Sequence, residues 1–175
     1  ALGAFQRRNF ALARTAAEAL LGGLDEGAVH AAAASVRVPG RFEVVGREPL
    51  TILDGAHNPG GMRALCASLA DARRPLVAVV SVLDDKDAAA MLAELLPRCD
   101  AVVCTANANP RALPPATLES LARQLGGPPA HLEPDPHRAL ALARELAGPE
   151  GTVLATGSIY LIADLHRPAG HTGPR

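Results

Sequence analysis

The stretch TILDGAHNPGGM (residues 51–62) joins a predicted buried strand to a predicted helix. The apolar residues before Asp54 form the strand, while Asn58 and Pro59 suit the N-cap and the first turn of the helix that follows. A tight turn of this kind explains the Asn-Pro pair. It does not explain why Asp54 and His57 lie together, so this seam is the first candidate for a functional site.

From this seam onward, strands that are apolar on both faces alternate with amphipathic helices. Predicted strands cover residues 49–53, 75–83, 100–105, 130–133 and 151–156, and predicted helices cover residues 59–72, 87–97, 115–125, 136–147 and 158–165. This alternation predicts a Rossmann-like α/β fold, in which a mostly parallel sheet has helices on both faces. A short strand, residues 42–45, is joined to the next strand by a tight turn, and we expect it to run antiparallel at the edge of the sheet.

Two further helices are predicted before the sheet begins, at residues 1–22 and 29–35. We therefore expect lead-in helices and an interdomain linker (residues 1–38), an α/β domain (residues 39–166) and a flexible tail rich in Pro, Gly and His (residues 167–175).

Composition excludes several classes of function. The chain has 175 residues, of which 49% are hydrophobic and only 2% aromatic, and its net charge is -1. With so small a net charge, the chain lacks the excess of positive charge that is typical of proteins that bind nucleic acid or an anionic membrane. No apolar run reaches the ~20 residues of a spanning helix, and the first residues of the sequence show no charged region followed by an apolar block. We expect a soluble, cytoplasmic protein that is monomeric.

The cysteine and histidine patterns do not indicate a metal site. The three cysteines are odd in number and form no C-x-x-C pair, so buried free thiols are expected. The six histidines also lack the spacing of a zinc site.

In a doubly wound fold, ligands bind beyond the carboxyl ends of the strands. Lys86 follows the strand at residues 75–83 and is the only lysine among 17 basic residues, which favours a functional role for it. For the neighbouring Asp84, Asp85 and Asp87 we favour a solvated charge cluster. Ser158 follows the last strand, where its hydroxyl is either a ligand contact or a plain N-cap.

The chain has neither a G-x-x-x-x-G-K-[ST] phosphate loop nor a G-x-G-x-x-G dinucleotide motif. The predicted fold is therefore of a type that binds nucleotides, but the chain itself has no phosphate-binding loop.

Longer motifs point to a family. The segments RVPGRFEVV and LTILDGAHNPGGMRAL resemble the start of the C-terminal domain of folylpolyglutamate synthase, including the enzymes that also act as dihydrofolate synthase, within the Mur ligase superfamily. The helix GAFQRRNFALARTAAEAL is similar to that family's G-x-H-Q-x-x-N-x-x-x-A helix, with Phe5 where His is usual. The segments LDDKD, VCTANANPRALP and TGSIYLIADL follow in family order.

The resemblance implies an ATP-dependent ligase that adds L-glutamate to a folate, or to dihydropteroate in the bifunctional enzymes. ATP phosphorylates the folate carboxylate, and the glutamate amine then displaces phosphate from the acyl phosphate. The phosphate loop and the Mg²⁺ ligands are expected in an N-terminal P-loop ATPase domain, which is absent from this chain. The fragment alone is therefore expected to be inactive.

The resemblance also implies roles for individual residues. It assigns the catalytic roles to Arg41 and His57. It assigns ATP contacts to Asn9 (adenine), Arg41 (phosphates), Asp54 (ribose or phosphate region) and His57 (the site of phosphoryl transfer). It assigns glutamate contacts to Lys86 and Ser158.

Two alternative functions stay open. One is another Mur-type amino-acid ligase, such as one that extends a cell-wall precursor. The other is a non-catalytic α/β module that binds a nucleotide or an amino acid.

Overall fold

The structure, a computed structural model, describes residues 4–168, which fall into two compact units with a boundary between Pro39 and Gly40. The first three residues of the predicted lead-in helix and residues 169–175 of the predicted tail lie outside the described residues.

The first unit consists of helices α1 (Ala4–Leu21) and α2 (Glu26–Ser35). The predicted start of α2 was three residues too late, because Asp25 caps the helix by accepting a hydrogen bond from the backbone N–H of Ala28 at 2.7 Å. Arg14 of α1 pairs with Glu26 at 2.6 Å and so ties the two helices together.

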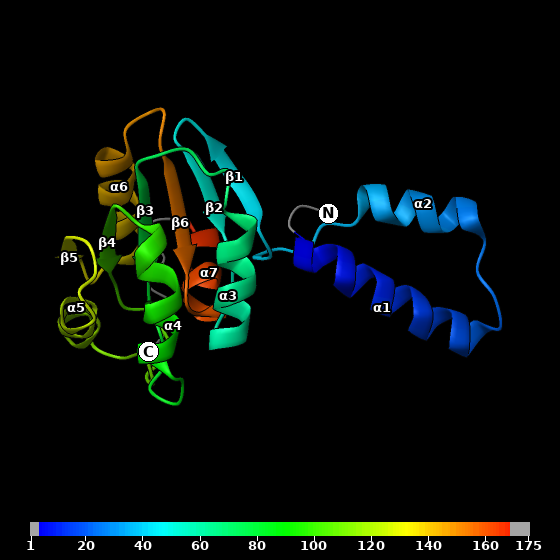
Figure 1. The fold of residues 1–175 in the computed structure, drawn as a ribbon, viewed down its shortest axis with the longest axis horizontal. Coiled ribbons are helices and arrows are strands. Elements are labelled where there is room, and N and C mark those ends of the chain that lie inside the picture. The colour runs from blue at the N-terminus through cyan, green and yellow to red at the C-terminus, as the bar shows by residue number, and fades with distance from the viewer. Residues whose placement is uncertain (1–3, 169–175) are drawn as a thin grey trace. The chain divides into compact units, whose positions relative to one another are not determined.

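The second unit holds a six-stranded sheet in the order β1-β2-β6-β3-β4-β5 (Figure 1). The strands are β1 (Glu43–Arg47), β2 (Leu50–Leu53), β3 (Leu76–Val80), β4 (Ala101–Cys104), β5 (Ala130–Leu132) and β6 (Thr152–Thr156). Only the pairing of β1 with β2 is antiparallel, and all other neighbours run parallel. The predicted mostly parallel sheet with an antiparallel edge strand is confirmed.

Helices cover both faces of this sheet (Figure 1). They are α3 (Pro59–Ser68), α4 (Ala88–Leu95) with a 3₁₀ turn at Leu96–Arg98, α5 (Pro115–Gln124), α6 (Pro136–Ala147) and α7 (Ile159–His166). α3, α4 and α5 pack on one face, and α6 and α7 pack on the other. None of the helices described between residues 4 and 168 has the length and apolarity that crossing a membrane requires.

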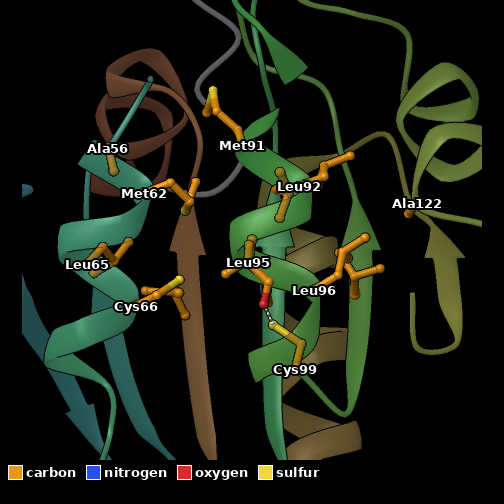
Figure 2. Packing of buried hydrophobic residues seen from close by; sticks show 14 of the residues in the cluster. Ala56, Met62, Leu65, Cys66, Met91, Leu92, Leu95, Leu96, Cys99 and Ala122 are labelled. Atoms are coloured by element: carbon orange, nitrogen blue, oxygen red, sulfur yellow. Dashed lines mark hydrogen bonds between the residues drawn. The ribbon is translucent and has the colours of Figure 1, made fainter. Parts of the chain in front are cut away.

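The central strand β3 shows how the core is built. All five of its residues are buried. Ala78 and Val80 face the α3, α4 and α5 side, whereas Val77 and Val79 face α6 and α7. Figure 2 shows the first of these layers, where apolar side chains of α3 and α4 converge over the sheet. A core of aliphatic side chains on both faces leaves polar chemistry only at the ends of the strands.

All three cysteines are buried free thiols, as predicted. The Cys99 thiol donates to the carbonyl oxygen of Leu95 (Figure 2), and that of Cys66 donates to the carbonyl oxygen of Glu94. Burial raises the pKa of Cys66 to about 11 and the pKa values of Cys99 and Cys104 to about 12 each. These thiols are therefore neutral at pH 8, although the thiolate is the reactive form.

We expect the folded chain to resist alkylation by iodoacetamide at pH 8, while the chain in guanidinium chloride takes up three labels. Because the folded pKa values are raised, the stabilisation by neutral thiols is complete below the ordinary thiol pKa of about 8.5. It is lost as the pH rises through about 11 to 12. Mass spectrometry counts the labels, and rapid labelling of any one thiol in the native chain would contradict this assignment.

Candidate active site at the carboxyl edge of the sheet

The core changes from apolar to polar at the carboxyl ends of the strands. The buried polar residues at this edge are Asp54 after β2, Ser81 after β3, Thr105 after β4, and Thr156 and Ser158 at the end of β6. Since this is the edge at which doubly wound folds bind ligands, these residues define the candidate site.

Asp54 holds two loops together at this edge. It is only 2% exposed, and its Oδ2 accepts a hydrogen bond from the backbone N–H of Phe42 while its Oδ1 accepts one from Ala56, both at 2.8 Å. Phe42 has a φ of 49°, a strained conformation for a residue with a side chain. The Asp54 carboxylate is what holds this conformation in place.

The electrostatic environment of Asp54 contains opposing effects. Burial raises the pKa of Asp54 above its ordinary value, while the N–H groups of Phe42 and Ala56 and the nearby positive charges of Arg41 and His57 oppose the rise. The buried acid therefore lies close to both residues for which a catalytic role is expected.

His57 is oriented by its own turn. Its Nδ1 lies 2.9 Å from the carbonyl oxygen of Gly55, and because a carbonyl can only accept, Nδ1 carries the proton and donates. The side chain is half-buried, and its Nε2 is left to form a hydrogen bond with a ligand. The next residue, Asn58, caps α3 by accepting from the N–H of Gly61 at 2.7 Å, as predicted.

Arg41 lies directly before the strained Phe42 and is exposed. Within residues 4–168 its guanidinium forms neither a hydrogen bond nor an ion pair with another side chain. A cation held close to a buried acid, yet exposed, suits an anionic ligand such as a phosphate.

Ser158 is the N-cap of α7. It is 2% exposed, and its Oγ accepts a hydrogen bond from the N–H of Tyr160 at 3.1 Å. The preceding Gly157 donates its N–H to the carbonyl oxygen of Ala56 at 3.1 Å, which brings the β6–α7 loop against the loop that carries His57. The hydroxyl of Ser158 thus acts as a cap and lies next to the candidate site as well.

Lys86 belongs to a separate charge cluster in the loop after β3. Its Nζ lies 2.8 Å from Oδ2 of Asp85, whose Oδ1 is 3.5 Å from the guanidinium of Arg111. The hydrogen bond from Lys86 lowers the pKa of Asp85. Asp85 therefore bridges two cations, beyond the solvated role predicted for it, and Asp87 caps α4 by accepting from Ala90.

The structure thus brings four of the predicted site residues together within the second unit. Hydrogen bonds to the Asp54 carboxylate and between backbone groups bring the turns that carry Arg41, Asp54, His57 and Ser158 together at one edge. No hydrogen bond or ion pair among the described residues joins the Lys86 cluster to them. Asn9 is exposed on α1 in the first unit, where its Nδ2 donates to the side-chain oxygen of Gln6 at 3.3 Å.

No group of three or more His, Cys, Asp or Glu side chains is arranged to hold a metal ion anywhere in residues 4–168.

Sequence reasoning missed the residues that support this site from a distance. Arg111 was not recognised as the second partner of Asp85, and neither Glu43 nor His166 was singled out. Phe42 was assigned to a strand, although its positive φ places it in the turn before β1. The available signal was weak, because these contacts join residues that are far apart in the chain.

Comparison with known proteins finds one matching family and relatives that share it. The family described as "Mur ligase, glutamate ligase domain" matches residues 40–159. The dihydrofolate synthase/folylpolyglutamate synthase of Mycobacterium tuberculosis is 43% identical over 133 residues, which cover 72% of this chain and 27% of that protein.

Solved structures of similar fold come from enzymes with the same names. A Mycobacterium tuberculosis folylpolyglutamate synthase complexed with ADP and AMPPCP matches with a TM-score of 0.87 at 37% identity, over 94% of this chain and 40% of that one. A bifunctional folylpolyglutamate synthase/dihydrofolate synthase with Mn, AMPPNP and L-glutamate bound matches with a TM-score of 0.73 at 32% identity, over 82% of this chain and 34% of that one. The chain therefore spans less than half the length of each of these relatives.

Proposed function

Because the chain belongs to the Mur ligase family, through its glutamate ligase domain, we propose that it is the C-terminal domain of an ATP-dependent folylpolyglutamate synthase. The ligase adds L-glutamate to a folate, and in a bifunctional form to dihydropteroate. The observation that carries this proposal is that the exposed Arg41 and the half-buried His57 both lie near the buried Asp54, at the carboxyl edge of the sheet. The relatives' ADP, AMPPCP, AMPPNP and L-glutamate complexes support the substrates.

The chemistry requires activation, since a carboxylate is a poor electrophile at neutral pH. An N-terminal P-loop ATPase domain, the proposed partner of this chain, holds the ATP phosphates and supplies the ligands for Mg²⁺, which neutralises phosphate charge when bound. From this chain, Arg41 faces the transferring phosphoryl group, and Nε2 of His57 donates or accepts a hydrogen bond beside it. Asn9 contacts the adenine.

Asp54 is proposed to serve ATP mainly through the loops that it holds. Both of its oxygens accept backbone N–H groups, and the side chain is 2% exposed, so little of it is open to a ribose or a phosphate. Its carboxylate fixes the turn that carries Arg41 and the turn that carries His57, which is the positioning that catalysis of this kind depends on.

Lys86 and Ser158 are proposed to hold the incoming glutamate. A glutamate carboxylate needs a cation, which the ammonium of Lys86 supplies, whereas Ser158 is only 2% exposed and serves the glutamate through the β6–α7 loop that it caps. Asp85 holds the ammonium in place at 2.8 Å until the substrate arrives. We further propose that the complete ligase is monomeric and cytoplasmic.

The experiment joins this chain to an N-terminal P-loop ATPase domain and measures ATP-dependent incorporation of labelled glutamate into a folate. In that ligase, we expect Lys86→Ala to raise the glutamate KM by about tenfold and to leave the ATP KM near normal. Lys86→Arg is expected to restore only part of the affinity, because a planar guanidinium does not replace a compact ammonium.

The matched control is Arg63→Ala, which removes an exposed cation from its ion pair with Glu94 and leaves the proposed site intact. No ATP-dependent incorporation by the wild-type ligase would overturn the proposed function. A change confined to the ATP parameters in Lys86→Ala would overturn only the role given to Lys86.

A further inference from the structure

The turn that carries Arg41 is fixed on both sides of that residue. Before it, the carbonyl oxygen of Gly40 accepts the N–H of Gly55 at 2.8 Å. After it, the N–H of Phe42 is bound by Asp54 at 2.8 Å. A third backbone group of the turn, the N–H of Gly40, donates to Oε2 of Glu43 at 2.7 Å.

A residue far along the chain holds Glu43 in this position. Nε2 of His166, at the end of α7, lies 3.0 Å from the same Oε2. A carboxylate oxygen can only accept, so the imidazole N–H donates, and a single oxygen takes hydrogen bonds from Gly40 and His166 together. The side chains of His166 and Glu43 are 39% and 30% exposed, so the pair lies at the surface.

α7 contacts the same turn a second time. Gly40 has a φ of +66°, and a Cβ there would lie 2.8 Å from Cγ2 of Ile162. Ile162 and His166 are four residues apart and therefore lie on one face of α7. On this face of α7, the side chain of Ile162 thus packs against Gly40, and the side chain of His166 orients Glu43.

We propose that Glu43 and His166 are positioning residues for Arg41. Glu43 holds the backbone at Gly40, His166 holds the Glu43 carboxylate in the conformation that reaches it, and the guanidinium of Arg41 is directed as a result. The inference rests on the proposed function, because it assumes that Arg41 acts on a phosphoryl group.

The physical argument separates this role from a contribution to stability. An exposed ion pair adds little to the stability of a fold, so removal of His166 or Glu43 should leave the unfolding transition nearly unchanged. A charge-assisted hydrogen bond to a backbone N–H is stronger, and a small displacement of a catalytic group lowers the rate of reaction markedly. The expected effect therefore lies in kcat and in local backbone mobility.

The first test uses the chain itself and needs no activity. In Glu43→Ala, we expect the Gly40 amide to exchange hydrogen about tenfold faster and the Arg41 amide to become more mobile in ¹⁵N relaxation. The Ala56 amide, which is bound by Asp54, is the internal reference and should not change. Glu43→Gln keeps the accepting oxygen and should restore most of the protection.

The second test uses the two-domain ligase. We expect Glu43→Ala to lower kcat by roughly fivefold and His166→Ala by roughly threefold, with the glutamate KM unchanged and Glu43→Gln within about twofold of wild type. Arg123→Ala, which removes an exposed ion pair with Glu119 on α5, is the matched control.

Unchanged exchange at Gly40 in Glu43→Ala would overturn the proposal, as would a wild-type kcat in both Glu43→Ala and His166→Ala. An inactive wild-type ligase would instead count against the proposed function, and the exchange and relaxation measurements would still decide whether Glu43 fixes the turn.

Discussion

In the two-domain ligase, Arg41→Ala is expected to lower kcat for ATP-dependent glutamate ligation by on the order of 10², which corresponds to about 2.7 kcal/mol. A guanidinium that faces the transferring phosphoryl group interacts more strongly with the transition state, where charge is spread over that group, than with bound ATP. The loss should therefore fall on kcat, with a smaller effect on the glutamate KM.

The position of Arg41 supports an effect of this size. It lies between two backbone groups that are each fixed by a hydrogen bond, at Gly40 and Phe42, so its guanidinium starts from a defined backbone. Arg41→Lys should recover only part of the rate, because an ammonium cannot form the paired hydrogen bonds of a guanidinium.

Arg47→Ala is the matched control for Arg41→Ala. Arg47 is also exposed, but it pairs in register with Leu50 at the start of β2, at the opposite edge of the sheet from Asp54. Steady-state kinetics with ATP and glutamate varied separately would decide. A near-wild-type kcat in Arg41→Ala, or an equal loss in Arg47→Ala, would remove Arg41 from the phosphoryl site.

The second large effect concerns stability. Gly157→Ala is expected to destabilise the fold by about 3 kcal/mol or more. Gly157 has a φ of +100°, and a Cβ there would lie 2.5 Å from the carbonyl oxygen of Ser81 and 3.2 Å from Cγ2 of Val82. The nearer atom belongs to the backbone after the buried central strand β3, so it cannot move aside as a flexible side chain could.

Gly148→Ala provides the control for Gly157→Ala, since it separates steric overlap from backbone strain. Gly148 also has a positive φ, +63°, but nothing lies within 4 Å of a Cβ at that position. Gly148→Ala should cost less than Gly157→Ala, on the order of 1 to 2 kcal/mol, which is the cost of the backbone conformation alone. Chemical denaturation of both variants gives the two free energies of unfolding. Equal losses would show that the close approach of Gly157 to Ser81 is not the cause.

Much of the fold was accessible from the sequence because its signals are local. The apolar run before Asp54 and the Asn58-Pro59 pair each need only a few neighbouring residues to be recognised, and both are confirmed. The antiparallel edge strand followed from a short turn. The order of the strands depends on which distant segments pair, and no local pattern carries that information.

The candidate site, too, has residues that the sequence could identify and residues that it could not. His57 and Asp54 could be singled out because they interrupt a pattern that a plain turn would explain. The partners that orient the site could not, since Asp54 binds a residue 12 positions away and Glu43 binds one 123 positions away. The residues around Glu43 in the sequence therefore contain no signal that its carboxylate will bind the imidazole of His166.

The place of β6 in the sheet has a consequence for how the chain reaches its native state. β6 is the last strand along residues 4–168, yet it lies between β2 and β3 and pairs with both. During synthesis, the earlier strands leave the ribosome first and cannot complete a continuous sheet, because their shared neighbour has not yet been made. Pairing across such sequence distances is slow, and the apolar edges of β2 and β3 stay open to aggregation while it is pending. The sheet can therefore be completed only after Thr156 has emerged.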